Sequence, residues 1–264
     1  MSELVVRVAG VGIYAPGLTS WPLARAVLLG ERAFEAADPP RPTPVALPAA
    51  ERRRAPDSVL YATQAAAEAC TMAQAEPAQL ACVFSSTQGD IAITDYMCST
   101  LASLPRELSP TKFHNSVHNA AAGYWSIATG CRAPSTALSA WTDSVGAGLL
   151  EAALQTVDTG APVLLAAYDV AATGALRSVV PFDCSFAFAL VLAPDAASGT
   201  RLVLRAASDT GPNDEPDLDW ARDLRARNPC ANGLALLQAL ALGAPQRLRI
   251  GAGAHFSLQV EVAP

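Results

Sequence analysis

The chain has 264 residues, of which 51% are hydrophobic and 16% are charged, and its formal net charge is −6. Soluble domains usually contain about a quarter charged residues, so this composition indicates either a broad surface buried against another subunit or a simple bias toward alanine. The acidic balance and the presence of a single lysine, Lys112, leave no basic stripe and argue against nucleic-acid binding.

Hydrophobic patterns and turn residues predict alternating strands and helices along most of the chain. The predicted strands cover residues 4–13, 80–85, 136–140, 163–168, 186–192, 201–207 and 256–262, and the predicted helices cover 21–29, 58–74, 90–104, 113–129 and 144–158, with further helical sequence up to 242. We expect residues 193–199 to form the turn of an antiparallel pair, and the last strand to be an edge or half-exposed strand. This order predicts a layered α/β domain with a mixed sheet.

The six cysteines are scattered along the sequence, and no two of them form a C-x-x-C pair. This spacing argues against a zinc or thioredoxin-like site and predicts free, mostly buried thiols. The N-terminus lacks the basic segment and apolar run of a signal peptide, and no apolar stretch is long enough to span a bilayer. We therefore expect a cytoplasmic protein that binds no membrane, no metal and no cofactor.

Residues 133–152 have the pattern of a buried strand, a tight turn and a helix. Such a turn can hold a reactive side chain at a helix N-terminus, where the dipole and the free N–H groups stabilise an anion. Here the turn carries Trp141, Thr142, Asp143 and Ser144, and no cysteine. We expect Asp143 to cap the helix that follows.

Two further patterns could carry chemistry. His114 and His118 are four residues apart, so on one helix they would share a face at metal-ligand spacing, but there is no glutamate between them and no third ligand. The alternative is that both imidazoles hydrogen-bond to neighbouring helices or to the backbone. A serine hydrolase would need Ser144, His118 and Asp169 together, yet no glycine precedes Ser144 at the spacing of a nucleophile elbow.

From about residue 5 to 207 the sequence resembles the N-terminal half of the β-ketoacyl-(acyl carrier protein) synthases, which have the thiolase fold. Residues 119–123 resemble the family's N-x-x-A-G helix at the dimer interface, and residues 181–183 resemble its P-F-D motif. Residues 133–135 with 139–141 resemble the G-P-(x)n-T-A-C pattern that ends in the nucleophilic cysteine. The resemblance implies a thiolase-like layered αβαβα half with a mixed five-stranded sheet, in which residues 1–264 form a single domain.

The departures from this family pattern concern catalysis. Trp141 aligns with the nucleophilic cysteine to within one residue, and neither of its neighbours is cysteine. Loss of the thiol removes the covalent acyl-transfer step. The family's arginine- and glycine-containing loop after P-F-D is shortened, and the sequence has no counterpart of the second half that carries the two decarboxylation histidines, since only His255 lies near its end. We therefore expect no self-sufficient ketosynthase.

Residues 113–126 are similar to the short chain length factors of bacterial aryl polyene clusters. The resemblance implies a non-catalytic subunit that pairs with a full-length β-ketoacyl-ACP synthase and limits product length in polyene, polyketide or fatty-acid-like biosynthesis. The expected tunnel or interface residues are Tyr96, Met97, Phe113, His114, His118, Trp125 and Trp141. Because acyl carrier proteins are usually acidic, as this chain is, we expect the carrier protein to dock mainly on the partner.

Two other functions stay open on the sequence alone. One is an acyl transferase or hydrolase that uses Ser144, and the other is a homodimeric acyl-binding scaffold without a synthase partner. For the aromatic and methionine side chains expected in the tunnel, the plain alternative is ordinary packing in the core.

Overall fold

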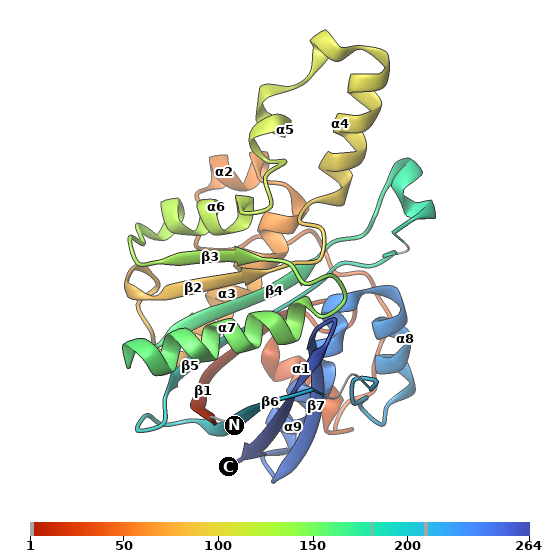
Figure 1. Cartoon of the computed structure of the whole chain (residues 1–264). Helices are drawn as coiled ribbons and strands as arrows, with labels where there is room; N and C mark the ends of the chain where they lie inside the picture. The colour runs from red at the N-terminus through yellow and green to blue at the C-terminus, as the bar shows by residue number, and fades with distance from the viewer. Residues whose placement is uncertain (1–2, 181, 209–210) are drawn as a thin grey trace.

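The computed structural model of the chain describes residues 3–180, 182–208 and 211–264. Its strands are β1 (Leu4–Tyr14), β2 (Ala81–Ser85), β3 (Ser135–Leu138), β4 (Val163–Asp169), β5 (Phe186–Pro194), β6 (Thr200–Ala207), β7 (Gln246–Gly253) and β8 (Phe256–Ala263). Its α-helices are α1 (Trp21–Leu28), α2 (Ala49–Arg54), α3 (Asp57–Ala73), α4 (Ile91–Ser103), α5 (Pro110–His114), α6 (Ala120–Thr129), α7 (Ser144–Thr159), α8 (Asp219–Arg227) and α9 (Leu234–Leu242). Figure 1 shows the sheet with helices packed on it, and α4 and α5 standing away from it. In these described ranges no helix is long and apolar enough to cross a bilayer.

The eight strands form one mixed sheet in the order β3-β2-β4-β5-β1-β6-β8-β7. β2 is parallel to β3 and β4, whereas the other neighbouring pairs are antiparallel. The thiolase-like α/β architecture with a mixed sheet is confirmed, but the expectation of five strands is wrong. The sheet continues past β1 through β6, β8 and β7. No strand was predicted at β7, because Arg247, Arg249 and two glycines interrupt its hydrophobic pattern.

The predicted antiparallel pairing of β5 with β6 is also wrong, because β1 lies between them. Residues 195–199 instead cross from one side of β1 to the other. The Arg7 side chain on β1 fixes this crossing by donating hydrogen bonds to the carbonyl oxygens of Asp195 and Gly199, each at 3.0 Å. Gly199 has a φ of +125°, and a Cβ there would lie 2.3 Å from the Val8 carbonyl oxygen, so the crossing requires glycine.

The last strand, β8, shows why alternation alone does not locate an edge. Its side chains alternate between buried and partly exposed positions, as expected, but it lies between β6 and β7. The two edges of the described sheet are β3 and β7. Alternation reports that one face of a strand is solvated, and it carries no information about neighbouring strands.

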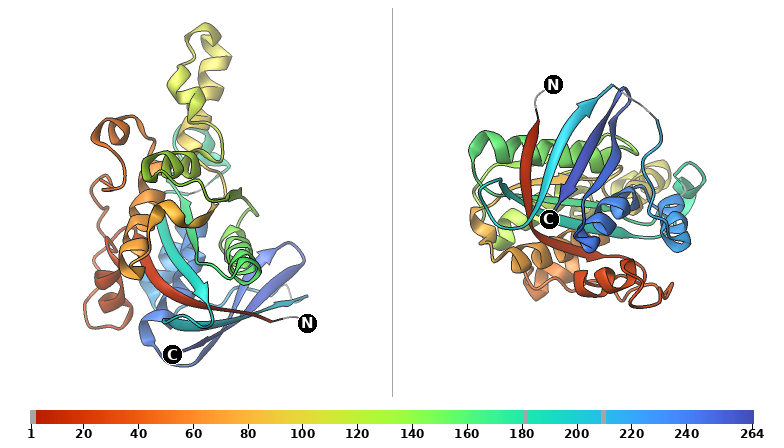
Figure 2. Two further views of the ribbon diagram at one scale, coloured as in Figure 1. Left: turned by 90° about the vertical axis from the view of Figure 1, so that its left-hand side faces the viewer. Right: turned by 90° about the horizontal axis from the view of Figure 1, so that it is seen from below.

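Helices cover both faces of the sheet (Figure 2), and each face has its own hydrophobic cluster. The helices α3 and α6 pack on one face, and α1, α7 and α9 pack on the other. The contact of α3 with β1 is very close, since a Cβ at Gly10 or Gly12 would lie 2.1 Å from the carbonyl oxygen of Ala69 or Ala65, respectively. The run of alanines in this helix therefore serves close packing, and it is not only a compositional bias.

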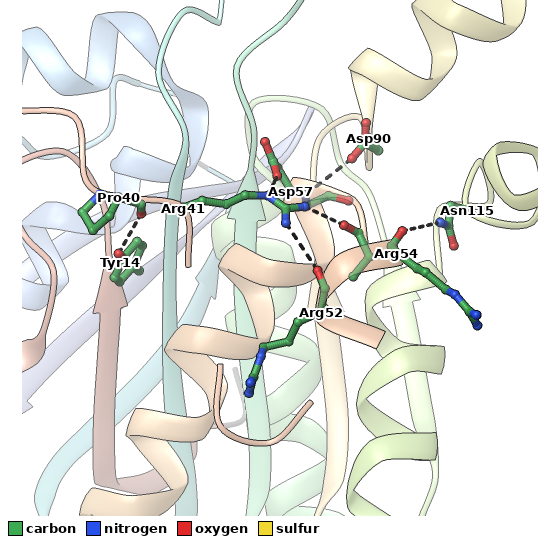
Figure 3. Close-up of polar contacts among 10 residues, drawn as sticks. Tyr14, Pro40, Arg41, Arg52, Arg54, Asp57, Asp90 and Asn115 are labelled. Atoms are coloured by element: carbon green, nitrogen blue, oxygen red, sulfur yellow. Dashed lines mark hydrogen bonds and ion pairs between the residues drawn. The ribbon is translucent and has the colours of Figure 1, made fainter. Parts of the chain in front are cut away.

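The helix expected over residues 113–129 is divided in two, with α5 ending at His114 and α6 beginning at Ala120. The break is held at Asn115, whose buried side chain donates from Nδ2 to the Arg54 carbonyl oxygen at 3.5 Å, and by the Ser116 hydroxyl, which donates to the Phe113 carbonyl oxygen at 2.8 Å. The Ser116 bond is local and competes with continuation of a helix, whereas the Asn115 bond ties this segment to the end of α2 (Figure 3).

The start of α7 differs in one respect from the expectation. Asp143 occupies the N-cap position, but its side chain makes no capping hydrogen bond. Its Oδ1 instead lies against β7, 2.5 Å from where a Cβ at Gly251 would stand. This partly buried position raises the pKa of the Asp143 carboxyl group. The other end agrees with the sequence, because Gly160 ends the helix with a φ of +64°.

Candidate functional site

The turn between β3 and α7 places Trp141 at its apex with an unusual backbone conformation. Trp141 has a φ of +54°, in the left-handed region that bulky residues rarely adopt, and its side chain is 56% exposed. Its carbonyl oxygen accepts hydrogen bonds from the Ser144 hydroxyl at 2.6 Å and from the Ser144 N–H at 3.1 Å. The Ser144 hydroxyl oxygen in turn accepts from the Ala140 N–H at 3.0 Å. The turn is therefore held by Ser144 and its backbone neighbours.

The buried carboxyl group of Asp169 is linked to this turn through the Thr87 hydroxyl group. The Thr87 hydroxyl lies 3.1 Å from the Trp141 carbonyl oxygen and 2.9 Å from Asp169 Oδ2. Asp169 Oδ1 accepts from the Ser86 hydroxyl at 2.9 Å and from the Thr87 N–H at 2.8 Å. Burial raises the pKa of Asp169 to about 6, although these hydrogen bonds act in the opposite direction. The end of β4, the loop after β2 and the turn thus form one hydrogen-bonded unit.

The turn offers no activated nucleophile. Ser144 is 3% exposed, and its hydroxyl hydrogen points to the Trp141 carbonyl oxygen, so it has neither access nor a base. Of the six cysteines, only Cys98, on α4, is exposed. Burial raises the pKa of Cys70 to about 12 and that of Cys184 to about 11, which keeps these thiols protonated.

The two histidines at metal-ligand spacing, His114 and His118, have different surroundings in the structure. His118 lies in the turn between α5 and α6, and its Nε2 is 2.9 Å from the Ser86 carbonyl oxygen, so it donates to the backbone, as the plain alternative predicted. His114 ends α5 and lines a surface groove. In the part of the chain that the structure describes, no three histidine, cysteine, aspartate or glutamate side chains gather as metal ligands would.

The other expected tunnel or interface residues occupy two different environments. Tyr96 and Met97 are half-buried on α4, and Phe113 is 59% exposed on α5. The Tyr96 ring is fixed, because its hydroxyl accepts from the Ser109 N–H at 3.0 Å and the Lys112 ammonium stands 4.0 Å from its centroid. Trp125 does not fit a tunnel or interface role, because it is 0% exposed within the core cluster between α6 and the sheet.

Two hollows were not anticipated from the sequence. A surface groove of about 790 Å³ lies between α2, α5 and α6, and is lined among others by His114, Gly123, Tyr124 and Ile127. A smaller cavity of about 480 Å³ lies between the starts of α3 and α4, helix α5 and the segment after β4. Neither hollow has a local sequence signal, because each is assembled from segments far apart in the chain.

The fold and this strand–turn–helix site define a thiolase-like protein of the ketosynthase type. The family described as "Beta-ketoacyl synthase, N-terminal domain" matches residues 30–253, and the chain belongs to that family. The turn with Trp141 lies within the matched region, as do Phe182 and Asp183 of the P-F-D segment, whose Pro181 is outside the described residues. No curated protein matches the chain.

Several solved structures share the fold at low sequence identity. A chain of the complex of ketosynthase ApeO with its chain length factor ApeC from Xenorhabdus doucetiae is 22% identical, with a TM-score of 0.72 over 98% of this chain and 99% of that one. The ishigamide ketosynthase/chain length factor is 12% identical, with a TM-score of 0.66 over 100% of both chains. A β-ketoacyl synthase from Burkholderia phymatum is 15% identical, with a TM-score of 0.61 over 88% of this chain and 71% of that one.

Proposed function

We propose that this chain is a non-catalytic, ketosynthase-like chain length factor. In this proposal residues 1–264 act as one domain that pairs with an active β-ketoacyl-ACP synthase and shapes the acyl tunnel in polyene- or polyketide-type biosynthesis. The solved structures described as ketosynthase–chain length factor pairs, which match over nearly the whole chain, support this assignment.

The observation that carries the proposal is the residue at the apex of the β3–α7 turn. A synthase needs a thiolate there to accept the acyl chain, and this chain has an indole, which cannot form a thioester. The only hydroxyl group in direct contact with the apex carbonyl from within the turn, that of Ser144, is buried and already donates its hydrogen. The backbone of the site is thus retained without a group that could perform the covalent step.

The surface around α6 supports a partner subunit. β3 is an edge strand with one unpaired side in the described sheet, and an exposed strand edge favours pairing with another chain. Ile127, on the neighbouring helix α6, is 82% exposed, and Val117, in the turn before α6, is 52% exposed. The space above Gly123 is empty to at least 4 Å. An edge strand flanked by exposed apolar side chains is typical of a surface that is buried on assembly.

Tyr96, Met97 and Phe113 remain our candidates for residues that line the tunnel. His114, His118 and Trp141 remain candidates for the tunnel or for the interface with the partner. The helices α4 and α5, which carry the first three, project from the body of the molecule (Figure 2), so a partner could enclose them. The net charge of −6 supports docking of an acidic carrier protein mainly on the partner. The six free cysteines fit a reducing cytoplasm.

Co-purification with an active β-ketoacyl-ACP synthase from the same biosynthetic system tests the pairing. Gly123→Leu adds a side chain where the isolated chain has open space, so the fold should be kept, while association with the synthase should weaken by more than about tenfold if α6 lies at the interface. Ala226→Leu, on the exposed side of α8, is the matched control and should not affect association. The proposal would be refuted if the native chain and the control variant were both soluble monomers that do not co-purify with the synthase.

An acylation experiment separates the proposal from the enzymatic alternative. After incubation with acyl thioesters, intact-mass measurement should find no adduct on this chain. An adduct that disappears in Ser144→Ala would establish a transferase or hydrolase instead. A homodimer that persists at nanomolar concentration and retains lipid would favour the scaffold alternative.

A further inference from the structure

The side of α7 that faces away from the sheet carries an apolar stripe. Leu154 is 44% exposed and Val157 is 47% exposed, and Ala147 and Leu150, which share this side of the helix by their spacing, are partly exposed. These four residues are the α7 stripe. The opposite side of the helix, which packs on the sheet, is apolar too. In Figure 1 no other described element lies in front of the C-terminal half of α7. Apolar side chains on opposite sides of a helix are typical of a helix that is buried on both, which indicates that the stripe is covered on assembly.

The spacing of the α7 stripe indicates the shape of partner that fits it. Consecutive members are separated by three, four and three positions, which is the spacing along the seam of a coiled coil. Such a seam receives the side chains of a second helix that lies close to parallel or antiparallel to the first. An extended segment would instead present its side chains at a period of two. The α7 stripe therefore fits a helix.

Two carboxylates line one edge of the α7 stripe. Glu151 and Asp158 are seven positions apart, so they lie on the same side of the helix and about 10 Å apart along its axis. Glu151 Oε1 accepts a hydrogen bond from Gln155 Nε2 at 2.8 Å, and neither carboxylate forms an ion pair with a cationic side chain in the described ranges. The sequence of α7 contains no lysine or arginine. This acidic edge therefore complements a helix with cationic side chains at the same spacing.

The same charges act against pairing with a second copy of this chain. When two identical helices pair antiparallel about a two-fold axis, their equivalent edge positions face each other. The carboxylates of Glu151 and Asp158 on one copy would then face those on the other. Opposed like charges destabilise such a pair. The acidic edge thus favours a partner of different sequence over a homodimer.

We propose that the α7 stripe is the docking surface for a helix of the partner synthase that carries two lysine or arginine side chains seven positions apart. Glu151 and Asp158 select this helix over a second copy of the chain. The identity of the partner rests on the proposed function, whereas the shape and charge of its helix follow from α7. The stripe lies beside β3, since Gln155 Nε2 also donates to the Thr136 hydroxyl oxygen at 3.1 Å. It is therefore continuous with the strand edge proposed to face the partner.

Charge reversal tests the acidic edge, with binding of the full chain to the purified synthase measured by titration calorimetry. The double variant Glu151→Lys/Asp158→Lys should bind the synthase at least about tenfold more weakly than the native chain at low salt. The loss should shrink in about 1 M NaCl, where charges are screened within about 3 Å. The control Glu31→Lys/Glu35→Lys changes the net charge equally at exposed positions after α1 and should bind like the native chain. A loss that does not depend on salt, or no loss at all, would overturn the proposal.

A second pair of variants tests the apolar part of the stripe. Leu154→Ser/Val157→Ser changes only exposed side chains, so the fold should be kept, and binding to the synthase should weaken at least about tenfold. Leu242→Ser, at a position 47% exposed at the end of α9, is the control and should bind like the native chain.

The outcomes separate this inference from the proposed function. If the native chain binds the synthase and the α7 variants bind it equally well, the assignment of α7 is wrong while the proposed function stands. If the native chain does not bind the synthase, both are wrong. A homodimer of the native chain that Leu154→Ser/Val157→Ser dissociates would show that a second copy occupies the stripe, which would also sink the idea.

Discussion

Asp169→Asn tests the cost of the buried carboxyl group beneath the β3–α7 turn. In the variant, the amide oxygen can still accept from the Ser86 hydroxyl and the Thr87 N–H. The amide nitrogen then faces the Thr87 hydroxyl oxygen, and that hydroxyl can turn its hydrogen to the Trp141 carbonyl oxygen, 3.1 Å away. The substitution therefore keeps the hydrogen-bond network and removes only the titration of the carboxyl group.

The sign of the effect follows from the pKa of Asp169, which burial raises from its ordinary value of 3.8 to about 6. Cys230 and Tyr168, the titratable side chains beside it, have pKa values raised by burial and stay uncharged over this range. The folded state holds the proton of Asp169 more tightly than the unfolded state does. This contribution to stability is complete below about pH 4 and is lost as the pH rises through about 6. A shift of this size corresponds to at most about 3 kcal/mol.

Urea unfolding of the native chain and Asp169→Asn at about pH 4 and about pH 8 measures this contribution. Relative to the native chain, the variant should gain about 2 kcal/mol of unfolding free energy between the two pH values. Glu31→Gln, an exposed substitution, serves as the control for general charge effects. A difference between native chain and Asp169→Asn that is the same at both pH values would refute the reasoning.

Three further predictions concern packing and the proposed tunnel. Gly12→Ala should lower the free energy of unfolding by about 1–3 kcal/mol, because its Cβ would lie 2.1 Å from the backbone of α3, and thermal denaturation detects this. Trp125→Ala should cost about 3–5 kcal/mol in denaturant unfolding, whereas Trp141→Ala should cost less than about 1 kcal/mol; equal losses would contradict the assignment of Trp125 to the core. Met97→Ala and Phe113→Ala should each lengthen the product of the complex with the synthase, as mass spectrometry of the product would reveal; unchanged products from intact complexes would count against both as gates.

Local signals in the sequence were sufficient for most helices and strands. Asp90 caps α4 through the Ile93 N–H, and Gly130 ends α6 with a φ of +68°, so both boundaries depend on residues within a few positions. Strand pairing does not depend on such signals. The insertion of β1 between β5 and β6 is fixed by Arg7 and Gly199, which are 192 residues apart, and a hairpin is the natural prediction when only the short connection is considered.

The candidate site divides in the same way. The turn that carries Trp141 could be predicted, because strand, turn and helix are consecutive in the sequence. The support for that turn could not, since Thr87 and Asp169 come from two other strand ends and meet only in the folded sheet. The end of α5 could not be predicted either. The sequence around Asn115 has a helical pattern, and the hydrogen bond from Asn115 to the Arg54 carbonyl oxygen, which ends the helix, forms only in the folded chain.

The left-handed backbone at Trp141 means that the shape of the turn is independent of the residue at its apex. An indole is poorly suited to a φ of +54°, so the conformation is imposed by neighbours such as Ser144 and Thr87. The side chain at the apex can therefore be exchanged while the hydrogen bonds of Ser144 and Thr87 keep the backbone of the turn in place. A cysteine introduced there would stand at the start of α7, where the helix lowers a thiol's pKa, and, once the exposed Cys98 is replaced by serine, it would give a single exposed attachment point for a spectroscopic label.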